Sequence, residues 1–278
     1  MTGSTPMSRV ERVDLSSGDI RLTGLFASPT TSPRATIVAV HGLGMTARYF
    51  DYRALAGQSF LEFASESGYN VVSVNRPGYG GSSSFSDGMS TIEMQADALA
   101  SCVNSFLEHR DVGAGVIMMA HSFGCKVALS LSSRSLLRDL IGIELSSCGY
   151  RYEPGVRLDF SSHYRNWGPL RLYPPGTFLT LKDILATPPE QEIAEAARWT
   201  QIFPTLAKNI RVPIRLTFGE YEGWWRHDKD ALLEIQELLD SSPMVAVEQH
   251  PDAGHNIGLG ISAHEYHLKA LNFFDTLS

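Results

Sequence analysis

One serine, Ser122, stands in a pattern that is typical of an enzymatic nucleophile. It is the centre of Ala120-His121-Ser122-Phe123-Gly124, which follows the apolar run 116–119 and precedes a helix-like stretch. A strand that turns sharply into a helix holds its apical serine in a strained conformation and points the hydroxyl out of the sheet. Small residues must flank this turn because the two backbones pass close together. Alanine stands here where such turns usually have their first glycine, and it keeps the turn feasible.

The pentapeptide by itself has two interpretations. A serine before a helix is often an ordinary N-cap residue, whose side chain satisfies a backbone N–H of the first turn. As a nucleophile, a serine hydroxyl needs a base within hydrogen-bond reach, and histidine suits because its pKa lies near neutral pH. The imidazole in turn needs a carboxylate that fixes its tautomer and stabilises its charged form. The elements around Ser122 must therefore bring a histidine and a carboxylate to it.

Strand-like and helix-like segments alternate along most of the chain. Strands are predicted at 10–15, 20–27, 35–40, 69–74, 116–120, 140–145, 213–218 and 244–247. Helices are predicted at 60–66, 91–108, 123–134, 230–240 and 262–277. The first two strands, separated by Ser16-Ser17-Gly18-Asp19, indicate a hairpin. The remaining alternation predicts an α/β fold with a mainly parallel sheet and helices on both faces.

The region 149–209 interrupts this alternation. It is rich in Pro, Tyr, Trp and Arg and contains short helical pieces such as 190–203. An insertion of this size between two core strands is usually a functional lid. We therefore predict three segments, with core at 1–148 and 210–278 and a helical or irregular cap at 149–209.

Five motifs, each at the end of a predicted strand, occur in a characteristic order. They are His41-Gly42-Leu43-Gly44, Asn75-Arg76-Pro77-Gly78-Tyr79-Gly80-Gly81-Ser82, Ala120-His121-Ser122-Phe123-Gly124, Gly219-Glu220-Tyr221-Glu222 and Asp252-Ala253-Gly254-His255-Asn256. With these motifs the chain resembles the α/β-hydrolase superfamily over nearly all of its length outside the insertion. The resemblance implies an eight-stranded, mainly parallel sheet with a cap.

The resemblance also implies roles for individual residues. The superfamily has its nucleophile, acid and histidine in that order along the chain, which here gives Ser122, Glu222 and His255. The acid is commonly aspartate at the position of Glu222. Glu220 and Asp228 are alternatives, and Glu144 is a weaker one.

The same resemblance assigns the groups that stabilise the developing oxyanion. They are the backbone N–H groups of Phe123, which follows the nucleophile, and of Leu43, in the loop after the first buried strand. Gly44 allows close approach of the substrate. His41 is expected to brace the oxyanion loop and His121 to support the turn. Three further histidines are expected at the surface, namely His250, His264 and His267.

Aromatic residues in and near the insertion suggest an apolar pocket, with Tyr150, Trp167 and Trp224 as candidate substrate contacts. Many of these aromatic residues are equally compatible with a satellite core that holds the insertion in place. Four arginines are candidates for an anionic group such as a phosphopantetheine arm, or belong to a solvated face: Arg151, Arg157, Arg165 and Arg171.

Composition excludes several classes of function. The chain has 278 residues, 43% of them hydrophobic, with a formal net charge of −7 and no runs of basic residues. Such a chain is not expected to bind nucleic acid or an anionic membrane. Three cysteines without metal-like spacing fit a reduced compartment, and the polar start 1–6 does not resemble a signal peptide. We expect a cytoplasmic protein that needs no cofactor or metal, and the sequence leaves its oligomeric state open.

These observations favour a serine hydrolase that cleaves a carboxylic ester or thioester of a small, mainly apolar molecule, or of a carrier-bound acyl group, through an acyl-enzyme. The same residues also serve C–C bond hydrolysis, lyase or cyclisation chemistry on this scaffold. A small-molecule receptor that retains the fold without catalysis is the third interpretation.

Overall fold

The computed structural model describes residues 10–53, 59–85, 90–157 and 162–277. The N-terminal residues 1–6, on which the expectation about a signal peptide depends, lie outside these ranges. None of the described helices is long and apolar enough to cross a bilayer.

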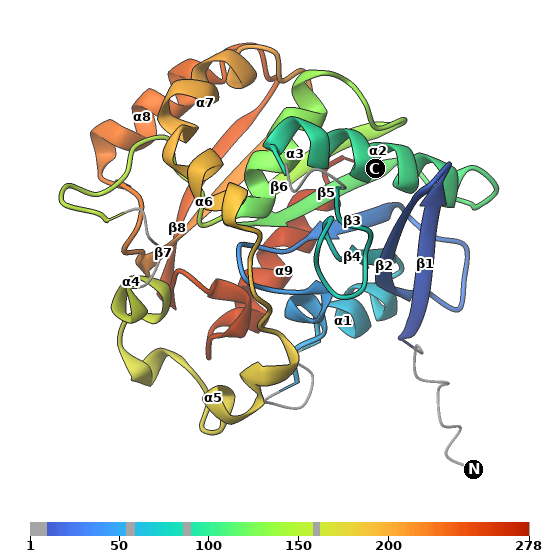
Figure 1. Cartoon of the computed structure of the whole chain (residues 1–278), viewed down its shortest axis with the longest axis horizontal. Helices are drawn as coiled ribbons and strands as arrows, with labels where there is room; N and C mark the ends of the chain where they lie inside the picture. Colours follow the sequence, from blue (N-terminus) through green and yellow to red (C-terminus); the bar gives the residue numbers. More distant parts are fainter. Residues whose placement is uncertain (1–9, 54–58, 86–89, 158–161, 278) are drawn as a thin grey trace.

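Eight strands form a single sheet in the order β1-β2-β4-β3-β5-β6-β7-β8 (Figure 1). The first two strands and the β2–β4 pair are antiparallel, and the other neighbours are parallel. The bounds are β1 Glu11–Ser17, β2 Ile20–Ala27, β3 Thr36–Val40, β4 Asn70–Val74, β5 Val116–His121, β6 Leu140–Ser146, β7 Ile214–Tyr221 and β8 Val245–Gly254. The predicted fold class and the N-terminal hairpin are confirmed.

Helices cover both faces of this sheet. The main ones are α1 Phe60–Glu66, α2 Ile92–Leu107, α3 Phe123–Ser133, α8 Lys229–Leu238 and α9 Ala263–Phe274. Two hydrophobic clusters correspond to the two faces: one includes residues of α2, α3 and α8, and the other includes residues of α1 and α9.

The strands supply both clusters because successive side chains of a strand point to opposite faces. In β3, Val38 and Val40 belong to the cluster beneath α2 and α3, whereas Ile37 and Ala39 belong to the cluster beneath α1 and α9. All five residues of this strand are buried, as expected for a parallel strand that is covered on both sides.

The chain between β6 and β7 contains helices but, within its described residues, contributes no strand to the sheet. Its elements are α4 His163–Trp167, η2 Leu170–Leu172, α5 Thr177–Thr180, η3 Leu181–Asp183, α6 Glu190–Ala197 and α7 Trp199–Ala207. The helical piece predicted at 190–203 is two helices, which meet at Arg198. In Figure 1 α4 and α5 lie beyond the carboxyl end of β7, whereas α7 packs against α3 on one face of the sheet.

Strand β8 is longer than the predicted strand 244–247, because it continues to Gly254. The extension Glu248-Gln249-His250-Pro251-Asp252 is too polar to indicate a buried strand. Strand β8 is an edge strand, however, and an edge tolerates both polar residues and proline. His255 therefore follows the strand directly instead of following a loop.

Candidate active site

Ser122 occupies the sharp turn between β5 and α3. Its backbone has φ 51° and ψ −115°, a region that residues other than glycine rarely adopt. Its N–H donates to the carbonyl oxygen of Ser146 at 2.9 Å, which fixes the turn to the neighbouring strand β6. A Cβ atom on Gly124 would lie 2.4 Å from the carbonyl oxygen of Val40. Glycine is therefore required where the start of α3 passes the end of β3.

A continuous hydrogen-bond chain joins Ser122, His255 and Glu222. The Ser122 Oγ lies 2.9 Å from His255 Nε2. The other ring nitrogen, Nδ1, lies 3.0 and 2.9 Å from the two carboxylate oxygens of Glu222. With Nδ1–H donating to the carboxylate, Nε2 is left as an acceptor for the serine hydroxyl. Ser147 Oγ donates to the backbone carbonyl of His255 at 2.7 Å and fixes the position of this residue.

The carboxylate of Glu222 is buried and yet favoured in its charged form. Burial alone would raise its pKa, but attraction to His255, hydrogen bonding to His255 and a 2.8 Å bond from the Trp224 N–H outweigh this effect. The pKa of Glu222 is therefore held below its ordinary value. A carboxylate that stays ionised in this position can stabilise a positively charged imidazole.

The other three candidate acids have partners elsewhere. Glu220 accepts from the Asp252 N–H, and Asp228 caps α8 and pairs with Arg226. Glu144 is buried and pairs with Arg215. Of the four carboxylates that the sequence left open, the structure brings Glu222 alone within hydrogen-bond distance of His255.

The loop that carries Leu43 packs directly against the Ser122 turn. A Cβ atom on Gly42 would lie 3.1 Å from the Cβ of Ser122, so a residue larger than glycine would crowd the turn. Gly44 has φ 66°, and its N–H donates to the Tyr79 hydroxyl at 3.2 Å. The N–H of Phe123 belongs to the first turn of α3, where N–H groups have no acceptor within the helix.

A buried ion pair lies behind this loop. Arg76 and Glu192 are both fully buried and form a salt bridge between the core and helix α6. The Arg76 guanidinium also donates to the carbonyl oxygens of His41 and Gly42, each at 3.0 Å. Tyr79 Oη donates to Glu192 at 2.6 Å. The contacts of Arg76 thus tie the loop that carries Leu43 to α6.

The histidines near the turn are held neutral. Burial lowers the pKa of His41 well below its usual value, and the nearby Arg76 lowers it further. Burial has the same effect on the pKa of His121, and His255 adds to it. His121 stacks on Tyr49 at 4.5 Å and lies 3.2 Å from Asn256 Oδ1.

Two of the three histidines expected at the surface are buried, so this expectation was wrong for them. His250 packs beneath α9 and donates from Nε2 to the Ser262 carbonyl oxygen, 3.1 Å away. His267 lies on the inner face of α9 against Phe60. His264 is exposed, as expected. The error arose because the sequence alone did not show that the polar end of β8 is covered by α9.

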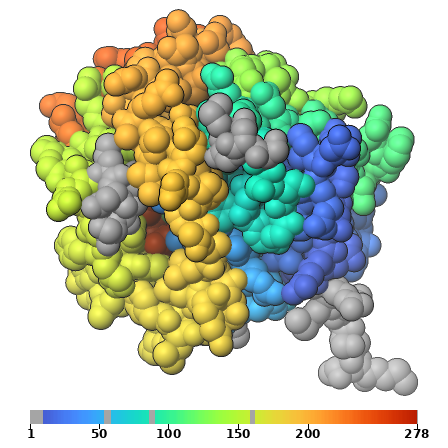
Figure 2. All heavy atoms as spheres, in the orientation of Figure 1, coloured from blue at the N-terminus to red at the C-terminus, as the bar shows by residue number. Residues whose placement is uncertain are grey.

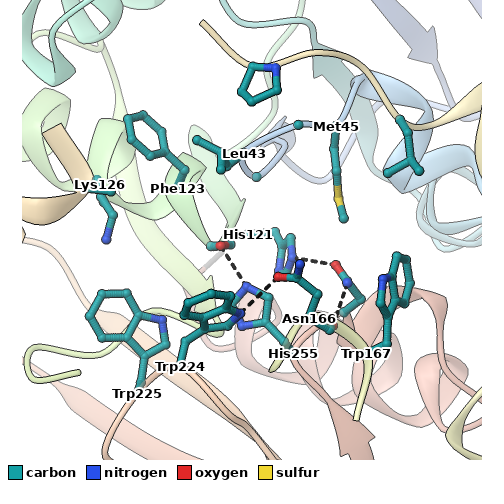
Figure 3. A pocket seen from close by; sticks show the side chains of 17 residues that line it. Leu43, Met45, His121, Phe123, Lys126, Asn166, Trp167, Trp224, Trp225 and His255 are labelled. Atoms are coloured by element: carbon teal, nitrogen blue, oxygen red, sulfur yellow. Dashed lines mark hydrogen bonds between the residues drawn. The ribbon is translucent and has the colours of Figure 1, made fainter. Parts of the chain in front are cut away.

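A pocket of about 290 Å³ opens next to Ser122 and His255. In Figure 2 a hollow separates the yellow-green part of the chain from its golden part, and red atoms from the C-terminal part lie at its floor. Seventeen residues line the pocket (Figure 3). The predicted contacts Leu43, Gly44, Phe123, Trp167 and Trp224 are among them, together with Met45, Leu185, Pro188 and Ala196.

Tyr150, which the sequence suggested as a substrate contact, does not line this pocket. It stacks on Phe203 with ring centroids 5.3 Å apart and packs against the hydrophobic core. Its aromatic side chain belongs to the satellite core that holds the insertion in place, the alternative that the sequence left open.

Two polar lining residues, Asn166 and Lys126, were not indicated by the sequence. Asn166 accepts from Trp224 Nε1 at 3.0 Å, and its carbonyl oxygen accepts from Asn256 at 2.9 Å. Trp225 and Lys126 lie side by side in the pocket wall (Figure 3). Lys126 was detectable in principle, because it stands four residues after Ser122 and thus on the same side of the expected helix.

The fold and this site together define the class of protein. The family model described as "Alpha/beta hydrolase family" matches residues 37–266. The chain therefore belongs to the alpha/beta hydrolase family.

Solved structures of similar fold include several enzymes. A thermostable carboxyl esterase from Bacillus coagulans has a TM-score of 0.71 and 15% identity, over 98% of this chain and 99% of the esterase. E-2-(acetamidomethylene)succinate hydrolase has a TM-score of 0.69 and 15% identity, over 96% and 100% of the two chains. A thioesterase domain from the curacin biosynthetic pathway has a TM-score of 0.58 and 13% identity, over 95% and 99%. At these identities the likeness concerns the fold. A comparison with curated protein sequences finds no match.

Proposed function

We propose that this protein is a serine hydrolase that cleaves a carboxylic ester or thioester of a small, mainly apolar substrate. The observation that carries the proposal is the hydrogen-bond chain from Ser122 through His255 to Glu222, with Ser122 held at φ 51°. Nucleophile, base and carboxylate lie in the order and at the distances that acyl transfer requires.

In this mechanism Ser122 Oγ attacks the carbonyl carbon while its proton passes to His255 Nε2, and Glu222 stabilises the resulting imidazolium. The oxyanion accepts hydrogen bonds from the N–H groups of Leu43 and Phe123. The intermediate collapses, and His255 gives the proton to the leaving alcohol or thiol. Water then attacks the acyl-enzyme with His255 as base, which releases the carboxylic acid and restores Ser122.

The pocket supports a small substrate, because its volume is about 290 Å³ and its lining is mainly aliphatic and aromatic. Residues of the insertion 149–209 contribute Asn166, Trp167, Leu185, Pro188 and Ala196 to this lining. We infer that the insertion is a cap that covers the reacting ester. Ser122 and His255 together with the aromatic wall thus form one enclosed site.

A fluorophosphonate probe tests this proposal. Wild-type protein should be labelled, Ser122→Ala should not, and Ser84→Ala, which changes an exposed serine, should be labelled like the wild type. A folded wild-type protein that fails to react would overturn the hydrolase assignment in favour of a receptor. A panel of 4-nitrophenyl esters and acyl thioesters then measures turnover. Labelling without turnover of any of them would redirect the assignment to C–C bond, lyase or cyclisation chemistry at the same residues.

Glu222→Gln should reduce kcat by about 10²- to 10⁴-fold, because the imidazole loses the group that fixes its tautomer. Glu220→Gln is the matched control, since Glu220 lies two residues away and bonds to Asp252 instead of His255. Circular dichroism establishes that both variants are folded. A large loss in the Glu220 variant with a normal Glu222 variant would show that the acid is misassigned.

A further inference from the structure

Three lysine or arginine side chains in the described part of the chain are at most 2% exposed, namely Arg76, Lys126 and Arg215. Arg76 pairs with Glu192, and Arg215 pairs with Glu144 and with Glu248. Lys126 differs from both arginines. Its neighbours that affect its charge are the thiols Cys148 and Cys125, and no described carboxylate lies within ion-pair distance of it.

The ammonium group of Lys126 lies in an aromatic cage. Its Nζ is 4.4 Å from the ring centroid of Trp199, 4.3 Å from that of Trp225 and 6.0 Å from that of Tyr152. Aromatic faces attract a cation without accepting conventional hydrogen bonds from it. The one hydrogen bond that the described residues offer is to Cys148 Sγ, at 3.9 Å. An ammonium has three donors, so two of them lack an acceptor within the described structure.

Lys126 lies in the wall of the pocket beside Ser122. Among the seventeen described lining residues, Lys126 is the one lysine or arginine. In Figure 3 its amino nitrogen points down toward Trp225, on the same side of the pocket as Trp224. Lys126 stands four residues after Ser122, which corresponds to about 6 Å along a helix axis. A group bound to Lys126 therefore lies only a few bonds from a carbonyl carbon placed at Ser122.

We propose that Lys126 anchors a carboxylate of the substrate, so that the pocket takes a small ester or thioester with one anionic end. The inference rests on the proposed function for the position of the scissile bond. A carboxylate accepts the free N–H donors in a site that is shielded from water, where such charge-assisted bonds are strong. It also compensates a buried charge that would otherwise be costly to keep. The carboxylate belongs either to the acyl half or to the alcohol half of the ester.

Paired substrates that differ in one charge test the proposal. The acyl arm compares mono-4-nitrophenyl glutarate with methyl 4-nitrophenyl glutarate, and the alcohol arm compares the butyrate ester of glycolic acid with its methyl ester. In one arm the wild type should favour the anionic ester in kcat/KM by at least about 10-fold. Lys126→Met should reduce this ratio by about 10- to 100-fold, the range expected for a lost charge-assisted hydrogen bond. The exposed control Lys208→Met should keep the wild-type ratio.

A ratio near one for the wild type in both arms would overturn the proposal, and so would a ratio that Lys126→Met leaves unchanged. If Lys126→Met fails to fold, the wild-type ratio of kcat/KM for the anionic and neutral esters still tests the proposal.

A binding measurement separates the site from the chemistry. Ser122→Ala is titrated with monomethyl glutarate and with dimethyl glutarate, and tryptophan fluorescence reports binding because Trp199 and Trp225 contact the Lys126 amino group. Tighter binding of the monoanion, by about 10-fold or more, supports the anion site even if wild-type protein cleaves no ester. Equal binding of both esters by a protein that does cleave neutral esters overturns the site and leaves the proposed function intact.

Discussion

Arg76 and Lys126 are both buried next to the Ser122 turn, but their surroundings differ. Arg76 lies 4.8 Å from the ring centroid of Phe123 and uses its guanidinium fully, on Glu192, Gln95 and the carbonyl oxygens of the oxyanion loop. Lys126 contacts two indoles and a thiol. The chain thus provides a buried carboxylate for one cation and aromatic faces for the other.

This difference in acceptors distinguishes a buried cation that stabilises the fold from one that can bind a ligand. A buried cation whose donors all have acceptors within the protein fixes the elements around it, and it has nothing left to offer a ligand. A buried cation with free donors in the wall of a pocket can form the rest of its hydrogen bonds only with a bound ligand. The contrast predicts opposite responses when each charge is altered.

The largest effect is expected at the Arg76–Glu192 pair. Glu192→Gln leaves the Arg76 charge buried without its counter-ion, which should lower the free energy of unfolding by about 3–5 kcal/mol. Urea denaturation followed by fluorescence measures this change. The control is Glu190→Gln, an exposed position on the same helix α6.

The double variant Arg76→Met with Glu192→Met removes both charges and should recover a substantial part of the lost stability, because no isolated charge remains. If Glu192→Gln unfolds at the wild-type urea concentration, the pair does not hold α6 to the core, and the contrast with Lys126 fails.

A smaller effect is expected at Tyr79, whose hydroxyl links the ion pair to the oxyanion loop. Tyr79→Phe removes the donor to Glu192 and the acceptor of the Gly44 N–H. Leaving buried polar groups unsatisfied costs about 1–3 kcal/mol. We expect this loss in the free energy of unfolding together with a lower kcat, since the loop that carries Leu43 is less well fixed.

Tyr164→Phe, at an exposed tyrosine of the insertion, serves as the control for this measurement. If Tyr79→Phe has the same free energy of unfolding and the same kcat as the wild type, the loop is held by its other contacts.

The Lys126 charge should contribute little to stability. Lys126→Met replaces an incompletely paired buried cation by an apolar side chain that fills similar space and packs well against aromatic rings. The free energy of unfolding should stay within about 1 kcal/mol of the wild-type value or exceed it, whereas Arg76→Met should destabilise as strongly as Glu192→Gln. If Lys126→Met lowers the free energy of unfolding by several kcal/mol, the charge stabilises the folded protein through its aromatic cage, and the contrast with Arg76 is wrong.

The sequence predicted the fold better than it predicted the site. Alternating segments and local turn signals indicated the strands, the helices and the N-terminal hairpin, because these are local properties of the chain. Ser122, Glu222 and His255 were predicted from motifs at the ends of strands, and the structure places them within hydrogen-bond distance of one another. The positions of Lys126, Asn166 and Tyr150 did not follow.

The reason is that those positions depend on how the insertion packs. Lys126 is recognisable as a pocket residue only once Trp199 and Trp225, which are 73 and 99 residues further along the chain, are known to surround it. The sequence indicated four arginines as anion partners instead. Among these, Arg151 pairs with Glu234, and Arg171 donates to the Tyr221 hydroxyl. An anion site formed by residues that are far apart in the sequence cannot be predicted from any short motif.

The smallest and most specific effect concerns pH. Burial lowers the pKa of Lys126, with Cys148 and Cys125 acting in the opposite direction, while the pKa of an unfolded lysine is about 10.4. Between these two values the unfolded chain binds more protons than the folded one, so Lys126 makes stability increase with pH. Cys148→Ser serves as background, because it removes the thiol nearest to Lys126. The free energy of unfolding is measured against pH for Cys148→Ser and for the double variant Cys148→Ser with Lys126→Met. The value for the double variant is subtracted from that for Cys148→Ser. This difference should increase with pH by at most about 1.4 kcal/mol per pH unit.

Cys125 and Tyr152, which also face the ammonium group, are present in both proteins of that comparison, so their own titration largely cancels in the difference. Saturating monomethyl glutarate should flatten the slope, since a bound carboxylate keeps the ammonium charged up to higher pH. A slope that is already flat or negative without the ligand would mean that Lys126 is fully stabilised as a cation by the protein itself. Lys126 would then resemble Arg76, and the distinction between the two buried charges would disappear.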